Sequence, residues 1–382
     1  MRNLLLLALV AAGFGFAGSL LAEEPAYRTD ANGDEKLPWY QTEPGKFPPV
    51  DSAHYFAGEL IEKDHVHRTG EIRVSRTDAQ RRHHWDVPIE FRLLPYGSLK
   101  YHGALAALQD IPLNTHLHGW YFAKDKDEEQ RKFYFNRESI ESDFTKAIRL
   151  MDDFSYYDEQ QKLFNVEAID LETMKLTLRG VDTASGEADK ETFDIDVTPA
   201  TRVYLGNQFV TLDEVKPGQK ILYNLTWATL YGIGRCTDLW LDEESRELAR
   251  NRQFEQHRLH IKYRGVPGWI DEVDNQNRIV TVTFFDGVDP HILEEFQVSG
   301  PVHGIVAEPT LQSYDQVNDR KVGPVVDIRD VPKVPGSSGK QVSFKPQLLL
   351  EGFRPGKIIR LTPVGWPMVA IPQEETLWPE RQ

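Results

Sequence analysis

Histidine is the residue type whose distribution points most clearly to chemistry. Eight of the twelve histidines fall within one stretch of the chain, namely His54, His65, His67, His83, His84, His102, His116 and His118. The last two flank a single leucine in the segment THLHG. Residues two apart on a β-strand point to the same face, so the imidazoles of His116 and His118 can both reach one metal ion.

A second histidine pair, His83 and His84, opens the segment HHWDVPIEF. One of these rings, together with Asp86, would complete a three- or four-ligand site for Cu or Zn with His116 and His118. In such a site the second nitrogen of each ring needs a hydrogen-bond partner. The commoner arrangement for a strand histidine is a half-buried ring bonded to carbonyl groups. The sequence leaves both alternatives open.

The sequence lacks the usual catalytic motifs: it has no GxSxG elbow, no Walker loop and no Rossmann glycine pattern. The single cysteine, Cys236, excludes an intramolecular disulfide and is expected to be a buried small hydrophobe. Acid pairs such as Asp152-Asp153 and Glu243-Glu244 are expected on solvated faces. A glycosidase pair cannot be chosen among them, because the required carboxyl separation is set by the fold.

Charge is unevenly distributed along an acidic chain of net charge −15. The net charge disfavours nucleic acid or an anionic membrane as a partner. A local basic stretch nevertheless contains Lys63, Arg68, Arg73, Arg76, Arg81 and Arg82, and is a candidate docking site for an anion or a glycan. Further along, His257 and His260 lie three residues apart on a predicted helix and are expected to be surface residues.

The N-terminus predicts export. Residues 1–22 contain one arginine and then a long apolar run, followed by Glu23-Glu24, which is the layout of a secretory signal peptide. The run could just span a bilayer as an uncleaved anchor, but its three glycines and one serine favour cleavage. No later segment approaches 18 consecutive apolar residues. We therefore expect an extracytoplasmic protein, periplasmic or secreted, without an integral membrane span after signal removal.

A strand–turn–strand pattern recurs three times and predicts an internal repeat. Its turn aspartates Asp64, Asp170 and Asp274 lie 106 and 104 residues apart, and each should bond its own backbone two residues on. Each copy ends with a leucine, a proline and an alternating strand, and the prolines are Pro112, Pro217 and Pro355. Counted from these prolines, His116 and His118 align with Ile221 and Tyr223, and with Ile359 and Leu361. The alignment predicts that the two histidines occupy barrel-facing positions.

The repeat predicts a mainly β fold of three tandem small OB-like β-barrel modules joined by short helical segments. The expected division is a signal peptide at 1–22, a flexible leader at 23–53, barrel module 1 at 54–124, a helical linker at 125–162, barrel module 2 at 163–241, a second helical linker at 242–264, and barrel module 3 at 265–382 with a long loop insertion at 303–340. A β-sandwich repeat is the rival architecture.

This strand pattern resembles secreted bacterial OB-like modules, and with the THLHG pair it is similar to periplasmic OB-fold metal carriers, which hold one copper ion on a small barrel. The HLHG string also resembles the first copper motif of multicopper oxidases. That family needs further histidine pairs and a His-Cys-His element, whereas Cys236 stands in GRCTDLW. The oxidase interpretation therefore lacks its ligands.

Three functions follow as hypotheses. The first is a non-enzymatic exported binding or scaffold protein whose partners are other envelope proteins or glycans, with no cofactor. The second is a metal-binding protein that holds Cu or Zn in its first barrel. The third is a carbohydrate-active enzyme. The sequence leaves the oligomeric state open.

Overall fold

The structure is a computed structural model that describes residues 26–76, 86–128, 133–135, 138–140, 142–226, 234–306 and 321–367. The predicted signal peptide at 1–22, His83 and His84 lie outside these residues. The fold is mainly β, with 46% strand and 13% helix, and contains closed five- and six-stranded barrels, which confirms the predicted fold class. Within the described residues, no helix has the length and apolar character needed to cross a membrane.

The first module is a closed five-stranded barrel. Its strands are β1 (His54–Asp64), β2 (Thr69–Val74), β3 (Pro88–Tyr101), β5 (His116–Ala123) and β8 (Phe144–Asp152), paired in the cyclic order β1-β2-β3-β8-β5. The short β4 (Ala104–Leu105) pairs with β3, η2 (Leu108–Asp110) leads to β5, and β6 (Phe133–Phe135) pairs with β7 (Glu138–Ile140). The core of this barrel is formed by Leu60, Ile72, Phe91, Leu117, Tyr121 and Leu150.

The second module is a seven-stranded sheet in the order β11-β10-β9-β14-β15-β12-β13. Its elements are β9 (Lys162–Asp170), β10 (Lys175–Asp182), β11 (Phe193–Asp196), β12 (Arg202–Leu205), β13 (Gln208–Val210), η3 (Leu212–Glu214), β14 (Lys220–Leu225) and β15 (Cys236–Trp240). Helix α1 (Asp153–Glu159) joins it to the first barrel. Cys236 is buried in its apolar core, as expected for a small hydrophobe.

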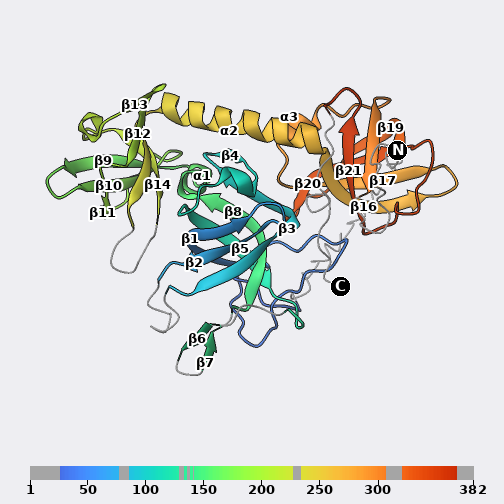
Figure 1. The fold of residues 1–382 in the computed structure, drawn as a ribbon, viewed down its shortest axis with the longest axis horizontal. Helices are drawn as coiled ribbons and strands as arrows, with labels where there is room; N and C mark the ends of the chain where they lie inside the picture. The colour runs from blue at the N-terminus through green and yellow to red at the C-terminus, as the bar shows by residue number, and fades with distance from the viewer. Residues whose placement is uncertain are drawn as a thin grey trace, which may run out of the picture.

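The third module is a closed six-stranded barrel in the order β16-β17-β20-β19-β18-β21. Its elements are β16 (Val266–Asp274), β17 (Ile279–Phe285), α3 (Pro290–Leu293), β18 (Pro301–Val306), β19 (Lys321–Asp330), β20 (Ser337–Phe344) and β21 (Ile358–Pro363). Valine, isoleucine and phenylalanine side chains from all six strands fill its core. Figure 1 shows this barrel at one end of the molecule and the second module at the other.

The aspartate turn is built alike in all three modules. Asp64, Asp170 and Asp274 each accept, through Oδ1, the backbone N–H groups two and three residues on, at 2.9–3.2 Å. Four residues after each aspartate the backbone is left-handed, with φ of 56° at Arg68, 53° at Met174 and 58° at Arg278. The predicted turn is therefore confirmed in each copy.

In the first module, the strand that follows the proline is shifted by one residue from the predicted alignment. The left-handed residue before the equivalent strand of each module is Asn114, Gly218 or Gly356, with φ of 66°, 89° and 80°. Each donates its N–H to one equivalent strand residue, namely Leu60, Val166 or Ile270. Gly218 and Gly356 directly follow their prolines, whereas Asn114 stands two residues after Pro112. The first module thus has one extra residue in this turn.

The extra residue makes Leu117, and not His116, the equivalent of Ile221 and Ile359. Leu117 is 0% exposed in the core of the first barrel, as the two isoleucines are in their own modules. A shift of one residue on a strand moves every side chain to the opposite face. The prediction that His116 and His118 face the barrel interior is therefore wrong, because both rings lie on the outer face of β5.

The predicted helical linker at 125–162 is wrong over most of its length. Residues 144–152 form β8, which pairs with β5 and in parallel with β3, so the first barrel extends to Asp152 and not to 124. Of the residues that the structure describes in this segment, only Asp153–Glu159 are helical. The acidic-then-basic order of this segment suggested a helix, but burial of Ala147, Ile148 and Leu150 between two strands outweighs that local preference.

Two predicted irregular segments also contain defined structure. Within the loop expected at 303–340, β19 and the first half of β20 are barrel strands; the glycines and prolines there had suggested a loop. Within the leader expected at 23–53, Tyr40 and Phe47 pack against an aromatic cluster that contains Tyr96 and Phe285. This cluster joins the first and third barrels, so the described part of the leader is anchored by its aromatic side chains.

Helix α2 (Glu243–Arg264), within the segment expected to be helical at 242–264, runs from the second module to the third across β4 of the first barrel (Figure 1). Asp242 caps its start by accepting the N–H of Ser245, and Gly265 ends it at φ 79°. The expectation that His257 and His260 are surface residues is wrong for His257, which is 2% exposed, and His260 is half-buried. Their side chains are shielded because α2 lies between the modules.

The burial of His257 predicts an acid-dependent loss of stability. Burial lowers the pKa of this ring to about 4, so below about pH 6.5 the unfolded chain takes up a proton that the folded chain does not. The free energy of unfolding therefore falls progressively between pH 6.5 and 4, by about 3 kcal/mol in total. Urea unfolding at pH 7 and pH 4.5 measures this loss. Between these two pH values the free energy of unfolding should fall less for His257→Gln than for the parent protein. An equal fall would contradict the role given to His257.

Candidate metal centre

The two histidines of THLHG lie on the outer face of β5, yet they are shielded from solvent. Each residue is 5% exposed. Strand β1 runs beside β5, with Ala57 opposite His118 and Glu59 opposite His116. The side chains of α1 cover the remaining side: the ring of Tyr156 stacks on that of His118 at 3.6 Å between centroids and 2° between planes. A pair of imidazoles is thus buried between the first barrel and the next element.

The acid that joins them is Asp153, the first residue of α1. Asp152 is the N-cap of this helix and accepts the N–H of Ser155 at 3.0 Å, which fixes the direction of the following residue. Asp153 is 1% exposed and points toward β5. The expectation that the Asp152-Asp153 pair lies on a solvated face is wrong, because the short helix is enclosed between the first barrel and β14.

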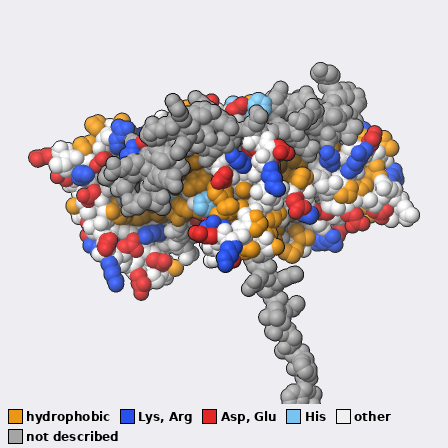
Figure 2. All heavy atoms as spheres, turned by 90° about the horizontal axis from the view of Figure 1, so that it is seen from below, with side chains coloured by type: hydrophobic (Ala, Val, Ile, Leu, Met, Phe, Trp, Pro, Cys, Tyr) orange, Lys and Arg blue, Asp and Glu red, His pale blue; other side chains and the backbone are white. Residues whose placement is uncertain are grey.

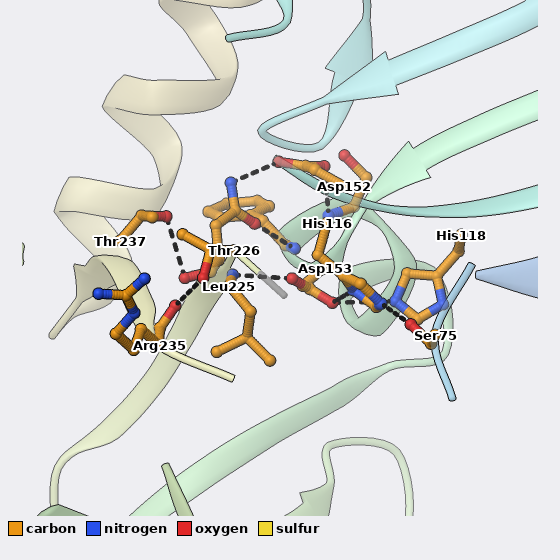
Figure 3. A network of polar contacts seen from close by, with 12 residues as sticks. Ser75, His116, His118, Asp152, Asp153, Leu225, Thr226, Arg235 and Thr237 are labelled. Carbon is orange, nitrogen blue, oxygen red and sulfur yellow. Dashed lines mark hydrogen bonds and ion pairs between the residues drawn. The ribbon is translucent and has the colours of Figure 1, made fainter. Parts of the chain in front are cut away.

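The carboxylate of Asp153 binds both rings through one oxygen (Figure 3). Its Oδ1 is 2.7 Å from Nδ1 of His116 and 3.0 Å from Nε2 of His118. Its Oδ2 accepts the backbone N–H of Leu225, on β14 of the second module, at 2.8 Å. One donor atom from each of His116, His118 and Asp153 lies within 4.8 Å of the other two, so the three could hold one metal ion.

The outer nitrogen of each ring is bonded to a hydroxyl group. Nε2 of His116 lies 3.1 Å from Oγ of Ser75, and Nδ1 of His118 lies 2.7 Å from the hydroxyl oxygen of Tyr55. A hydroxyl group can donate or accept. Each ring can therefore exchange its protonated nitrogen for the other one without losing its outer hydrogen bond.

Electrostatics keep the acid ionised. Burial alone would raise the pKa of Asp153, but the charges and hydrogen bonds of His116 and His118 outweigh burial and hold it well below its usual range. Burial lowers the pKa of His118, and its hydrogen bond to Asp153 opposes this shift. Because an ionised carboxylate only accepts hydrogen bonds, the nitrogens that face Asp153 carry protons in the metal-free cluster.

A second acid, Asp152, is held in the same junction by Asn224 of β14. Oδ2 of Asp152 accepts the side-chain N–H of Asn224 at 2.9 Å and the backbone N–H of His102 at 3.1 Å. Burial raises the pKa of Asp152 to about 6, against these hydrogen bonds. The side-chain oxygen of Asn224 accepts the N–H of Phe154 at 2.9 Å. The two adjacent acids therefore diverge, one toward the histidines and one toward Asn224.

Replacing Asn224 by alanine should weaken this junction. The change leaves the buried N–H of Phe154 without its acceptor and removes one of the two donors to Oδ2 of Asp152, which should lower the free energy of unfolding by about 2–3 kcal/mol. Asn165→Ala is the matched control, since that half-buried amide makes a 3.3 Å bond to Glu167. Urea unfolding of the two variants makes the comparison, and equal losses would contradict the role assigned to Asn224.

The structure brings together only part of the predicted ligand set. His83 and His84 lie outside the described residues, and Asp86 forms an ion pair with Arg76. His54 and His67 bond other aspartates, Asp30 and Asp64, at the surface. Asp153 is the candidate ligand that was not predicted from the sequence. Its position directly after a buried strand was the available signal, but that strand was predicted to be helix.

Comparison with known proteins gives little. No family model matches the chain, and no curated protein matches it. One solved structure with local similarity is a tryptophan-to-alanine variant of CusF from Escherichia coli with Cu(II), at 23% identity over 22% of this chain and 90% of that chain, with a TM-score of 0.16.

Proposed function

We propose that this chain is a metal-binding protein that holds one divalent transition-metal ion through Nδ1 of His116, Nε2 of His118 and a carboxylate oxygen of Asp153. The observation that carries the proposal is the convergence of these three buried donors together with a hydroxyl partner on the far nitrogen of each ring. Metal-binding histidines are usually oriented by such an outer hydrogen bond.

The proton arrangement supports uptake of an ion. A metal needs the lone pairs of the two nitrogens that face Asp153, so their protons must leave. Each proton can move to the outer nitrogen of the same ring, where the oxygen of Ser75 or Tyr55 accepts it. The ionised Asp153 would offset part of the charge of the ion inside a buried site. The two outer hydrogen bonds are kept, and the ion takes the place of the hydrogen bonds between Asp153 and the rings.

The donor set favours Zn(II) or Cu(II). Imidazole suits zinc and copper, and a carboxylate oxygen completes a set that zinc binds at about 2.0–2.2 Å. Cu(I) prefers sulfur, and the cluster of three donors contains none. We therefore expect zinc and Cu(II) to compete for one site.

Metal stoichiometry tests the proposal. Protein stripped with chelator and reconstituted with Zn(II) should hold one ion per chain by elemental analysis. His118→Gln should reduce this to a small fraction, because it removes one of three protein ligands. His67→Gln is the matched control, since His67 also bonds an aspartate, at 2.6 Å, but lies at the surface. Parent protein without zinc, or equal zinc in the two variants, would contradict the proposal.

We further propose that the chain acts outside the cytoplasm as a binding protein and not as an enzyme, with envelope proteins or glycans as partners. The support is the signal-like layout of residues 1–22, the acidic net charge and the lack of a catalytic motif in the sequence. Mass spectrometry of the secreted or periplasmic protein should give an N-terminus near residue 23. A full-length chain in the cytoplasmic fraction would contradict export.

A further inference from the structure

A second feature of the molecule shares no residue with the histidine cluster. It is a cavity of about 110 Å³ between the first barrel, helix α2 and the third barrel. At roughly 10–15 Å³ for each water, this cavity has room for several water molecules or one small ion. The residues that line it include Arg68, Arg264, Arg360, His257 and His260.

The cavity gathers positive charge in an acidic protein. Three arginines line it, and of the described lining residues only Asp286 is acidic. By contrast, basic and acidic side chains are interspersed over the described part of the face drawn in Figure 2. Arginine side chains present several N–H donors in a fixed plane and are favoured wherever a protein binds an oxyanion. The lining therefore has the composition of an anion site.

Arg68 enters the cavity from the aspartate turn of the first module. It occupies the left-handed position of that turn, with φ of 56°, and its guanidinium donates to the carbonyl oxygens of Pro95 and Gly97, each at 3.2 Å. Both acceptors are neutral, so they orient the group without balancing its charge. Two other arginines of the predicted patch lie in ion pairs: Arg73 pairs with Glu59, and Arg76 pairs with Asp86.

The other two arginines come from the end of α2 and from β21. Arg264 is the last residue of the helix, and Arg360 donates to the carbonyl oxygen of Gly265, the residue that ends it, at 3.2 Å. The pKa of His260 is lowered to about 3, mainly by burial and further by the positive charges of Arg264 and Arg360. His260 is therefore a neutral ring, and its Nδ1 lies 3.2 Å from the side-chain nitrogen of Gln109.

We propose that this cavity binds a small tetrahedral oxyanion, phosphate or sulfate, between Arg68, Arg264 and Arg360. A planar guanidinium presents paired N–H donors that match the oxygens of such an ion. The three arginines come from the first barrel, the connecting helix and the third barrel, so a bound anion would hold these parts together. This site is separate from the histidine cluster and does not depend on metal binding.

Calorimetric titration with inorganic phosphate tests the site on the full chain at constant ionic strength, with chloride as the reference salt. Parent protein should bind one phosphate, and Arg68→Gln and Arg360→Gln should each raise Kd at least about tenfold, as expected for loss of a charge-assisted hydrogen bond. Arg354→Gln is the matched control, because Arg354 is exposed and pairs with Glu351 at 2.7 Å. Sulfate should compete with phosphate, and acetate should bind more weakly.

Circular dichroism establishes that the variants fold. If Arg68→Gln does not fold, Arg68→Lys replaces it: the charge stays, the planar fork is lost, and Kd should still rise severalfold. Absence of phosphate binding by the parent protein, an unchanged Kd in the Arg68 and Arg360 variants, or acetate binding as tight as phosphate would overturn the proposal. A parent that binds phosphate but no zinc would overturn only the proposed metal function.

Discussion

Asp153→Ala is expected to lower the free energy of unfolding by about 3–5 kcal/mol in the absence of metal, as is usual when one partner of a buried charged cluster is removed. The change leaves three buried donors without an acceptor: Nδ1 of His116, Nε2 of His118 and the backbone N–H of Leu225. Because Leu225 belongs to the second module, the loss should also loosen the contact between modules. Urea unfolding in the presence of chelator measures the effect.

The control for this change lies on the same helix. Asp158 pairs with Arg250 at 2.8 Å, and the two side chains are 33% and 36% exposed. An exposed pair of this kind contributes about 0–1 kcal/mol. Asp158→Ala should therefore lower the free energy of unfolding by no more than about 1 kcal/mol. If Asp153→Ala were as mild as Asp158→Ala, the buried carboxylate would not be the centre of the junction.

Zinc is expected to stabilise the parent protein strongly. An ion that binds only the folded chain adds about 2.7 kcal/mol at a free concentration of one hundred times Kd, and about 4.1 kcal/mol at one thousand times. Thermal unfolding at increasing free Zn(II), set with a metal buffer, should thus show a rising Tm. Addition of chelator should return the protein to its metal-free Tm.

The stabilisation should vanish when the ligands are replaced. A double change, His116→Leu with His118→Leu, removes both ring donors, and its Tm should not respond to zinc. His54→Gln provides the control, since that ring bonds Asp30 at 2.9 Å on the surface of the same barrel. A zinc response that persists in the double variant would assign the ion to other residues.

The sequence predicted those parts of the fold that depend on local chemistry. The turn aspartates act through atoms two and three residues away, so their spacing alone located all three copies. The start of α2 was recognisable for the same reason, because Asp242 and the acids after it are local signals. Strand β8 was mistaken for helix because its pairing partners, β3 and β5, are distant in sequence.

The candidate site shows how a small error in alignment changes a structural conclusion. His116 and His118 were correctly recognised as a same-face pair, but one additional residue between Pro112 and Asn114 reversed the face to which they were assigned. No local signal separates the two alignments, since proline spacing and strand alternation agree with either. The left-handed backbone of Asn114, which matches Gly218 and Gly356, decides between them.

The third donor could not be predicted at all from spacing. Asp153 lies 35 residues after His118 in the sequence. It reaches His118 only because β8 returns beside β5. The burial of Asp153 also depends on β14, which contributes the N–H of Leu225. The site is therefore a product of two modules, whereas the prediction drew all its ligands from the first.

Anomalous scattering from crystals of the zinc-loaded protein, recorded on both sides of the zinc absorption edge, tests the central claim most directly. The expected result is one peak about 2.0–2.2 Å from Nδ1 of His116, Nε2 of His118 and an oxygen of Asp153. Absence of a peak there, with the hydrogen bonds from Asp153 to both rings intact, would contradict it.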